Sequence, residues 1–193
     1  MHQKTLMCIE ERRWRFEKVN IQGDRVILRA ISMKDASLLM ELINDPDTEK
    51  MLGGSSFPVS LESQQKWISS QSDRKDVLRC IVSSMDTEEG IGTVILSDID
   101  PKNGVAQIHI KMDKQKGRGK GYGTDALNAI VKYAFDEMRL NCVYADVLEY
   151  NAISQKLFEK CGFHRDGVLR GRVFKGGSYI DVVSYSRLKE DQK

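Results

Sequence analysis

The chain has 193 residues, a formal net charge of +2 and 30 % charged residues, which is typical of one soluble domain with a real core. The small net charge argues against binding of nucleic acid through overall charge. The cysteines are scattered without a C-x-x-C pair and the histidines lie far apart, so we expect reduced thiols and no metal site. No apolar run suits a membrane helix and the N-terminus lacks the apolar core of a signal peptide, so we expect a cytoplasmic protein without membrane contact.

Residues 1–20 are polar, and we expect them to form an N-terminal extension with Trp14 and Phe16 as packing anchors. A single domain is expected to follow at residues 21–190. Its first strand is predicted at 24–31, where apolar and β-branched residues alternate.

Helices are predicted to follow this strand. Ser32 and Asp35 fit a capping box, and apolar residues with helical spacing come directly after them. The segment NDPDTEKML ends this helix, and a short second helix is expected at 49–52. Ser60 is expected to begin a third helix, with a buried stripe of Leu61, Trp67 and Ile68.

Two strands are predicted at 77–85 and 91–99, and an Asn–Gly turn precedes a third strand at 105–112. A glycine-rich loop comes next. It leads into a long helix whose buried face is expected to consist of Ala126, Leu127, Ile130, Val131, Ala134 and Met138.

The C-terminal part is predicted to contain a buried strand at 142–149, a short helix stopped by Gly162, and a hairpin that turns at Lys175-Gly-Gly. The order of all these elements predicts an α+β or mixed α/β fold around one largely antiparallel sheet.

The loop in KMDKQKGRGKGYGTDALNAI (111–130) places four glycines and several basic residues between a strand and a helix. Backbone amides in such a loop converge on the positive end of the helix dipole and form an anion site. The nucleotide-binding pattern G-x-x-x-x-G-K-[ST] is absent. Gly121, Gly123 and Ala126 fit a dinucleotide fingerprint, with Asp146 at the next strand, but the preceding strands look antiparallel. The structural alternative is a solvated basic turn.

Four segments, in order, match one family. Arg118-x-x-Gly121-x-Gly123 resembles the acetyl-CoA pyrophosphate loop of the GNAT N-acetyltransferases, and EYNAISQKLFEKCGF resembles the second signature of that family. RVILRAISMKDASLLMELINDPDTEKMLG resembles the opening of the RimJ/RimL-like branch, and GVLRGRVFKGGSYIDVVSYSRLKED resembles its closing hairpin. The resemblance runs from about residue 20 to residue 190.

This resemblance implies a GNAT-type fold, with a central, twisted, mostly antiparallel sheet of about seven strands that is splayed in the middle and flanked by helices. It implies acetyl-CoA as co-substrate, no metal, and direct attack by a primary amine in a ternary complex. The acceptor is expected to be a protein N-terminus or a small amine such as a polyamine or an amino sugar. The protein is expected to be a monomer or homodimer that binds no nucleic acid.

The motif matches also carry the family's cofactor contacts onto this chain. The pantetheine arm is expected to pair with backbone in the splay beyond the strand that ends at Met112, where an amide of Ile110 to Met112 faces the thioester oxygen. The implied cofactor-binding residues are Ile110, Met112, Arg118, Gly119, Lys120, Gly121, Tyr122, Gly123, Thr124, Asn151, Ser154 and Phe158.

Relatives protonate the departing thiolate with a tyrosine of the second signature, and this chain has Phe158 at that position. Ser154, one helical turn earlier, is therefore expected to be the donor to the sulfur. Asn151 is expected to bond the pantetheine, to cap the helix, or both. Direct transfer is favoured over a covalent intermediate on Cys142 or Cys161, which are expected to pack in the core.

The base that deprotonates the amine is open among several residues. Glu149 is named with Ser154 as catalytic, and Tyr185 and Asp181 are candidates to line the amine side. The other base candidates are Asp146, Asp113, His109 and Glu49.

Loops at 45–58 and 171–179 are expected to set specificity. The acidic residues of the first loop either attract a cationic amine or solvate helix ends. The alternatives to an enzyme of this family are a non-catalytic acetyl-CoA-binding protein of the same fold, a Rossmann-type oxidoreductase, and an RNA-binding protein.

Overall fold

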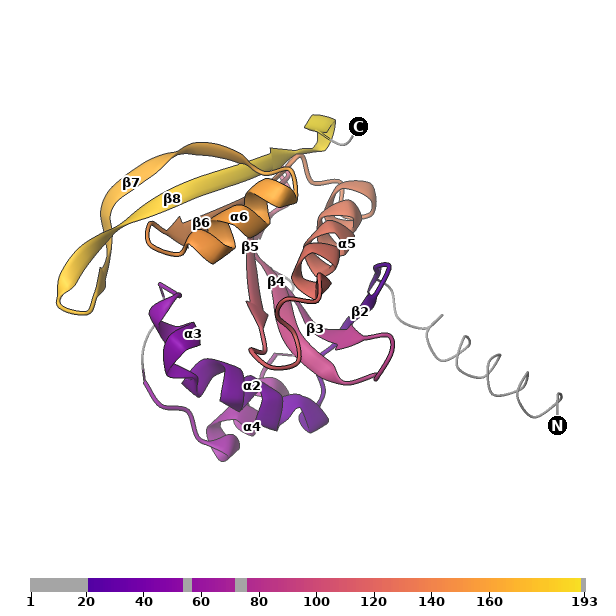
Figure 1. Cartoon of the computed structure of the whole chain (residues 1–193). Helices are drawn as coiled ribbons and strands as arrows, with labels where there is room; N and C mark the ends of the chain where they lie inside the picture. The colour runs from indigo at the N-terminus through magenta and orange to yellow at the C-terminus, as the bar shows by residue number, and fades with distance from the viewer. Residues whose placement is uncertain (1–20, 54–56, 72–75, 192–193) are drawn as a thin grey trace, which may run out of the picture.

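The computed structural model describes residues 21–53, 57–71 and 76–191, and Figure 1 shows their arrangement. The predictions for residues 1–20, including Trp14 and Phe16, lie outside the described residues. The strands form one eight-stranded sheet in the order β1-β2-β3-β4-β5-β6-β8-β7. The mixed α/β class and the mostly antiparallel sheet are therefore confirmed.

Each strand appears close to its predicted place. The sheet has one strand more than the seven or so expected, and the two-residue β1 is too short to leave an alternating pattern. The strands are β1 (Ile21–Gln22), β2 (Val26–Ala30), β3 (Leu78–Ser84), β4 (Gly90–Asp100), β5 (Val105–Met112), β6 (Cys142–Leu148), β7 (His164–Lys175) and β8 (Ser178–Leu188).

The helices divide between the two halves of the chain. The first three come between β2 and β3, whereas α5 and α6 flank β6. The helices are α2 (Ala36–Asn44), α3 (Pro46–Lys50), α4 (Leu61–Ser69), α5 (Tyr122–Asp136) and α6 (Ala152–Lys160), with single 3-10 turns at Met33–Asp35 and Lys189–Asp191. None of the helices in the described ranges is long and apolar enough to span a membrane.

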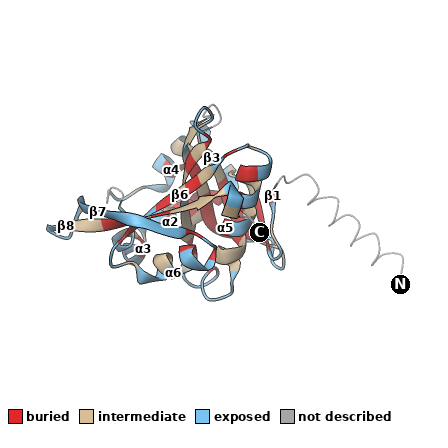
Figure 2. Cartoon of the chain, turned by 90° about the horizontal axis from the view of Figure 1, so that it is seen from above, coloured by how far each residue is buried: buried red, intermediate tan, exposed pale blue. Residues whose placement is uncertain are grey.

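The main core lies between α5 and one face of the sheet, and Figure 2 shows the buried residues on the central strands and on α5. Five of the six residues predicted for the buried face of α5 have no exposed surface; Met138 lies beyond the helix end and is half-buried. They pack against alternate strand residues such as Val94, Leu96 and Ile108. Alternation places Ile81 on the opposite face, where it lies near Leu38 of α2.

Of two local predictions for the N-terminal helices, one is confirmed and the other is partly wrong. The capping box is confirmed, because the Asp35 carboxylate accepts hydrogen bonds from the Ser32 backbone N–H at 2.8 Å and from Arg29. The buried stripe of α4 is wrong at Leu61, whose side chain is 40 % exposed, and Gln64 is the buried residue instead. Leu61 is the first residue of α4, directly after the N-cap Ser60, whereas Gln64 lies one turn further into the helix.

The short second helix also begins earlier than expected. Asp45 caps it and Pro46 occupies its first turn, so α3 starts at Pro46 rather than at 49. A proline at this position needs no hydrogen-bond partner for its nitrogen and already has helical φ.

The sheet opens in its middle. β5 and β6 run parallel, and their ladder has only three pairs, from Val105 with Cys142 to Gln107 with Tyr144. Beyond these pairs β5 continues along β4 to Met112, whereas β6 continues along β8 to Leu148. The expected splay is therefore present in the described sheet, between the C-terminal halves of β5 and β6.

Candidate functional site

The glycine loop joins β5 to α5 at the open end of the splay. Gly119 and Gly121 have left-handed backbone, with φ of 76° and 81°, and Gly121 is the N-cap of α5. Because this cap has no side chain, it leaves the first-turn amides of the helix without a side-chain acceptor. Amides at the positive end of a helix dipole can hold an anionic group.

Local contacts hold the loop in this shape. The Asp113 carboxylate accepts hydrogen bonds from the backbone N–H groups of Gln115 at 2.9 Å and Lys116 at 2.7 Å. A Cβ atom at Gly117 would lie 2.6 Å from the Ile91 carbonyl oxygen, so only glycine fits against β4 here. Asp113 therefore shapes the loop, which leaves it a poor candidate for the base.

The basic side chains of the loop contact neighbouring segments. Lys114 forms ion pairs with Asp45 at 3.0 Å and with Asp47, and Lys116 lies 3.3 Å from Glu89. The pKa of Lys114 is raised, first by its hydrogen bond to Asp47 and then by that to Asp45. Arg118, at its Nη2, donates to the Thr48 hydroxyl at 3.3 Å. In this part of the chain the backbone amides, more than these cations, are available to an anion.

The acidic residues at the start of α3, Asp45 and Asp47, have partners within the protein. This agrees with the alternative in which they solvate the end of a helix. The Asp45 carboxylate accepts from the Thr48 backbone N–H at 2.9 Å and from its hydroxyl at 2.5 Å. The Thr48 hydroxyl, together with Lys114, lowers the pKa of Asp45 to about 2. The pKa of Asp47 is also lowered, chiefly by its hydrogen bond to Lys114.

Gly123, in the first turn of α5, lies at the mouth of the splay. A Cβ atom there would lie 3.7 Å from side-chain carbons of Met112 and Leu157 and 3.9 Å from Ile110. The end of β5, the start of α5 and the inner side of α6 therefore meet at one place. Of the expected cofactor contacts, Ile110, Met112 and Gly123 are brought together here.

Asn151 caps α6 and ties it to the end of α3. Its side-chain oxygen accepts from the Ser154 backbone N–H at 3.1 Å, and its Nδ2 donates to the Met51 carbonyl oxygen at 3.1 Å. The expected capping role of Asn151 is confirmed, and a contact with pantetheine stays a prediction. Ser154 is half-buried on the same helix.

Phe158 lies in the core. Its side chain is 3 % exposed, and its ring centroid is 5.0 Å from that of Phe163 and 6.4 Å from that of Tyr185. Tyr185 is fully buried and its hydroxyl donates to Glu159 at 3.1 Å, so it packs behind Phe158 and does not line an amine site. Burial is the main cause that raises the pKa of Tyr185.

The remaining base candidates lie in different places. His109 and Asp146 are exposed on the sheet face opposite α5, where His109 Nε2 lies 2.9 Å from the Ser97 hydroxyl. Glu149 is exposed just after β6. Asp181 accepts a hydrogen bond from the Gly171 backbone N–H at 2.7 Å and so shapes the bulge in β7.

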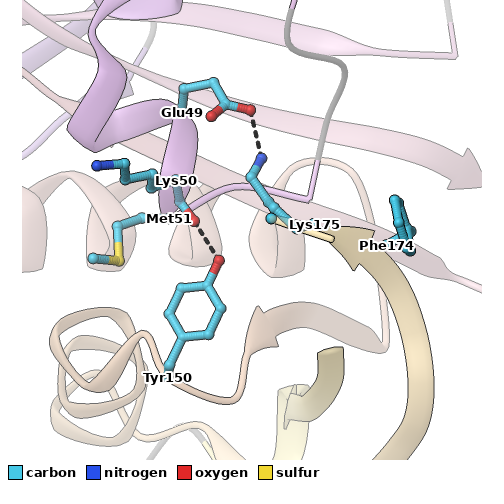
Figure 3. Close-up of a pocket in the computed structure, with 7 residues that line it drawn as sticks. Glu49, Lys50, Met51, Tyr150, Phe174 and Lys175 are labelled. Atoms are coloured by element: carbon cyan, nitrogen blue, oxygen red, sulfur yellow. Dashed lines mark hydrogen bonds and ion pairs between the residues drawn. The ribbon is translucent and has the colours of Figure 1, made fainter. Parts of the chain in front are cut away.

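A pocket of about 630 Å³ lies between the end of α3, the residue after Glu149 and the tip of the β7–β8 hairpin (Figure 3). Glu49 is the base candidate that lines it. The two loops expected to set specificity thus meet, because residues of both line this pocket. The rest of the lining consists of Lys50, Met51, Tyr150, Phe174, Lys175 and Gly176.

Three side chains hold the end of α3 at this pocket, and one of them makes two contacts. Lys175 Nζ lies 2.6 Å from Glu49 Oε1 and donates to the Leu52 carbonyl oxygen at 2.6 Å. The Tyr150 hydroxyl donates to the Lys50 carbonyl oxygen at 2.5 Å, and Asn151 is the third of these side chains. Sequence reasoning missed Tyr150 as a pocket residue, although it directly precedes the second-signature asparagine.

The cysteines of the described ranges fit the expectation of direct transfer. Burial raises the pKa of Cys161 to about 11 and that of Cys80 to about 12. Burial is also the main cause that raises the pKa of Cys142. Since the thiolate is the nucleophilic form, raised pKa values disfavour these thiols as nucleophiles.

Comparison with known proteins identifies relatives over most of the chain. Residues 25–164 match the family described as acetyltransferase (GNAT) domain. "Uncharacterized N-acetyltransferase p20" of Bacillus licheniformis is 29 % identical over 170 residues, covering 87 % of this chain and 95 % of that protein. "Putative ribosomal N-acetyltransferase YdaF" of Bacillus subtilis is 30 % identical, covering 90 % and 95 %.

A solved structure has the same fold. The spermidine N-acetyltransferase of Vibrio cholerae, in complex with CoA and spermine, has a TM-score of 0.81, with 23 % identity, covering 88 % of this chain and 98 % of that one. At this identity the similarity establishes the fold.

Proposed function

The chain belongs to the GNAT family of N-acetyltransferases, and we propose that it transfers the acetyl group of acetyl-CoA to a primary amine by direct attack in a ternary complex. GNAT acetyltransferases use acetyl-CoA, and the relative named as a ribosomal N-acetyltransferase is consistent with the RimJ/RimL-like branch. The proposal rests mainly on one observation: the glycine loop and the splay between β5 and β6 open at the same place.

In this proposal the backbone from Arg118 to Thr124 holds the pyrophosphate. The left-handed Gly119 and Gly121 bend the loop, and the first-turn amides of α5 point at the anion. The Lys120 carbonyl oxygen accepts from Arg25 Nη1 at 3.0 Å, which holds the loop from the side of β2. Tyr122 contributes its amide at the first helical position.

The open edges of β5 and β6 supply the rest of the cofactor site. Backbone groups at the end of β5 pair with the amides of the pantetheine arm in the way that an added strand would. A backbone amide between Ile110 and Met112 donates to the thioester oxygen and stabilises the charge that develops there. The acetyl group supplies the electrophilic carbon, and the chain's residues position it.

The reaction requires two proton transfers, one from the attacking amine and one to the departing thiolate. The amine nitrogen forms a bond to the acetyl carbon as the carbon–sulfur bond breaks, the amine loses a proton, and the thiolate gains one. Ser154, one turn before Phe158, is the proposed donor to the sulfur. Glu149, which is exposed beside the pocket residue Tyr150, is the proposed base and acts through water.

A second candidate function is binding of acetyl-CoA without catalysis. The buried Phe158, in the position where relatives carry a tyrosine hydroxyl, favours it. The two functions differ in turnover, since both predict that acetyl-CoA binds.

The test combines binding with turnover. Acetyl-CoA should raise the melting temperature, because a ligand that binds the folded state stabilises it. The protein should then release free thiol when acetyl-CoA is supplied with a panel of primary amines that includes an aromatic monoamine, a polyamine, an amino sugar and a peptide N-terminus. Binding without thiol release on any acceptor would leave the non-catalytic function, and a shift with NAD but none with acetyl-CoA would overturn both.

A further inference from the structure

Every acidic residue of α3 and its cap is paired with a lysine from a distant segment. Asp45 and Asp47 contact Lys114 of the glycine loop, and Glu49 contacts Lys175 of the β7–β8 hairpin. Among the described residues that line the pocket, Glu49 is the only acidic one. The negative charge expected to attract a cationic acceptor is therefore neutralised within the protein.

The pair between Glu49 and Lys175 is partly shielded from water. Their side chains are 25 % and 13 % exposed, and Lys175 Nζ has a second acceptor in the Leu52 carbonyl oxygen. Shielded charges are screened less by salt and solvent than surface charges, so an incoming ammonium has to compete with a well-held one. With the pair neutral, Lys50 leaves the pocket lining with a positive charge, and its side chain extends away from the pair in Figure 3.

The rest of the lining is apolar or aromatic. Met51 and the Tyr150 ring lie below the end of α3, and Phe174 lies on the hairpin side (Figure 3). Phe174 is 64 % exposed and packs edge-on against Tyr179, with 5.2 Å between ring centroids. An exposed aromatic side chain held at the rim of a pocket offers surface to an apolar or aromatic ligand.

We infer that the acceptor is a monoamine carried on an apolar or aromatic body, and that Lys175 is the residue that excludes polyamines. The inference rests on the proposed function, because it assigns the acceptor to this pocket. A monoamine reacts as the neutral amine and brings no charge with it at that moment. A polyamine keeps its other ammonium groups and carries them toward Lys50 and Lys175, where no unpaired carboxylate of the described lining receives them.

The test compares phenethylamine with spermidine as acceptors, with thiol release as the readout. The wild-type enzyme should prefer phenethylamine in kcat/KM by about tenfold or more, the scale of one partly shielded charge interaction. Lys175→Met removes the ammonium group that pairs with Glu49, so the lining loses a positive charge, and kcat/KM for spermidine relative to phenethylamine should rise by a similar factor, mainly through a lower KM. Lys102→Met, which makes the same charge change in the turn after β4, should leave the ratio as it is.

The ratio of kcat/KM for the two amines can be measured on the wild-type enzyme alone, so the inference stays testable if Lys175→Met unfolds. A wild-type preference for spermidine would overturn the inference while the proposed function stands. An unchanged ratio in a folded, active Lys175→Met enzyme would also overturn it. Thiol release with neither amine, nor with any other acceptor of the panel, would remove the proposed function and the inference together. Glu49→Gln combined with Lys175→Met should return the ratio toward the wild-type value, because Glu49 is the acidic residue of the described lining and the double variant lacks its charge.

Discussion

The glycines of the loop between β5 and α5 differ in backbone conformation, and so in what a substitution would change. Gly119 and Gly121 have left-handed backbone, so any other residue there is strained whatever space surrounds it. Gly123 has helical backbone and only ordinary neighbours for a Cβ atom. A substitution at Gly121 would therefore change both the stability of the fold and the binding of the cofactor. A substitution at Gly123 can change binding without loss of stability.

Gly123→Ala should weaken acetyl-CoA binding without loss of stability. Alanine is favoured over glycine in a helix by up to about 1 kcal/mol, so the melting temperature should stay or rise. The new methyl group would stand at the mouth of the splay beside Met112 and Leu157, and we expect about a tenfold rise in Kd, which corresponds to about 1.4 kcal/mol.

Calorimetry with acetyl-CoA and a thermal melt measure the two quantities. Gly167→Ala is the matched control, since a Cβ atom there would meet nothing within 4 Å and β7 is remote from the loop. Unchanged affinity in a folded Gly123→Ala protein would show that the cofactor does not pass through the splay.

Ser154 is half-buried one turn before Phe158, and its hydroxyl is the proposed proton donor. Ser154→Ala should lower kcat by about tenfold to a hundredfold, the lower range of general-acid contributions, with a smaller change in KM for acetyl-CoA. Steady-state kinetics resolve the two parameters. A higher KM with unchanged kcat would instead make Ser154 a binding contact.

Phe158→Tyr is the companion variant. A phenol at this position has to find a partner near the splay, because burying a hydroxyl without one destabilises the core. The double variant combines Ser154→Ala with Phe158→Tyr. If it is folded and recovers part of the kcat that Ser154→Ala loses, this would support protonation of the sulfur from this side of α6.

At the scale of elements, α3 links the two proposed subsites. Its first residues contact the glycine loop through Lys114 and Arg118, and its last residues form a wall of the pocket. A five-residue helix has little stability of its own, so these contacts decide where it lies. Binding at the loop is therefore expected to order the acceptor pocket.

Lys114→Met should weaken this link. The ion pairs are partly exposed, so we expect a modest effect: the factor by which bound CoA raises acceptor affinity should fall about twofold to fivefold. Calorimetry of the acceptor with and without CoA gives that factor. Lys116→Met is the control, because Lys116 belongs to the same loop but pairs with Glu89 in the turn before β4. Equal effects of the two variants would mean that α3 does not carry the link.

At the scale of the molecule, Asp125 joins the first edge of the sheet to α5. Its carboxylate accepts hydrogen bonds from the backbone N–H groups of Asp24 and Arg25 in the turn between β1 and β2, at 2.9 and 2.8 Å, and of Val26 at the start of β2, at 3.0 Å. The N-terminal strands are thereby held against the helix that begins at the proposed pyrophosphate site.

Asp125→Ala should lower the stability of the whole domain. Losing charge-assisted hydrogen bonds should cost about 2 to 3 kcal/mol, which in a domain of this size corresponds to a fall in Tm of roughly 5 to 10 °C. A thermal melt measures it, with Asp136→Ala as control, since Asp136 lies on the same helix and forms an exposed ion pair with Lys132. Gly23→Ala should act in the same direction, because its Cβ atom would lie 2.5 Å from Asp125 Oδ2. Melting temperatures equal to that of the control would show that this anchor contributes nothing.

The sequence by itself determined what depends on near neighbours in the chain. The Ser32–Asp35 box, the Asn151 cap and the apolar face of α5 follow from residues within a few positions of one another, and each was predictable. The glycine loop was predictable for the same reason, and together with the second signature it indicated the family and the splay.

The tertiary structure alone decided the charge of the pocket. Glu49 and Lys175 are 126 positions apart, and Lys114 and Asp47 are 67 apart, so no local pattern indicates that these charges meet. It also decided that Phe158 and Tyr185 share one buried cluster, because each faces inward from a different element. Contacts of this kind depend on how strands and helices pack, and packing depends on the whole chain at once.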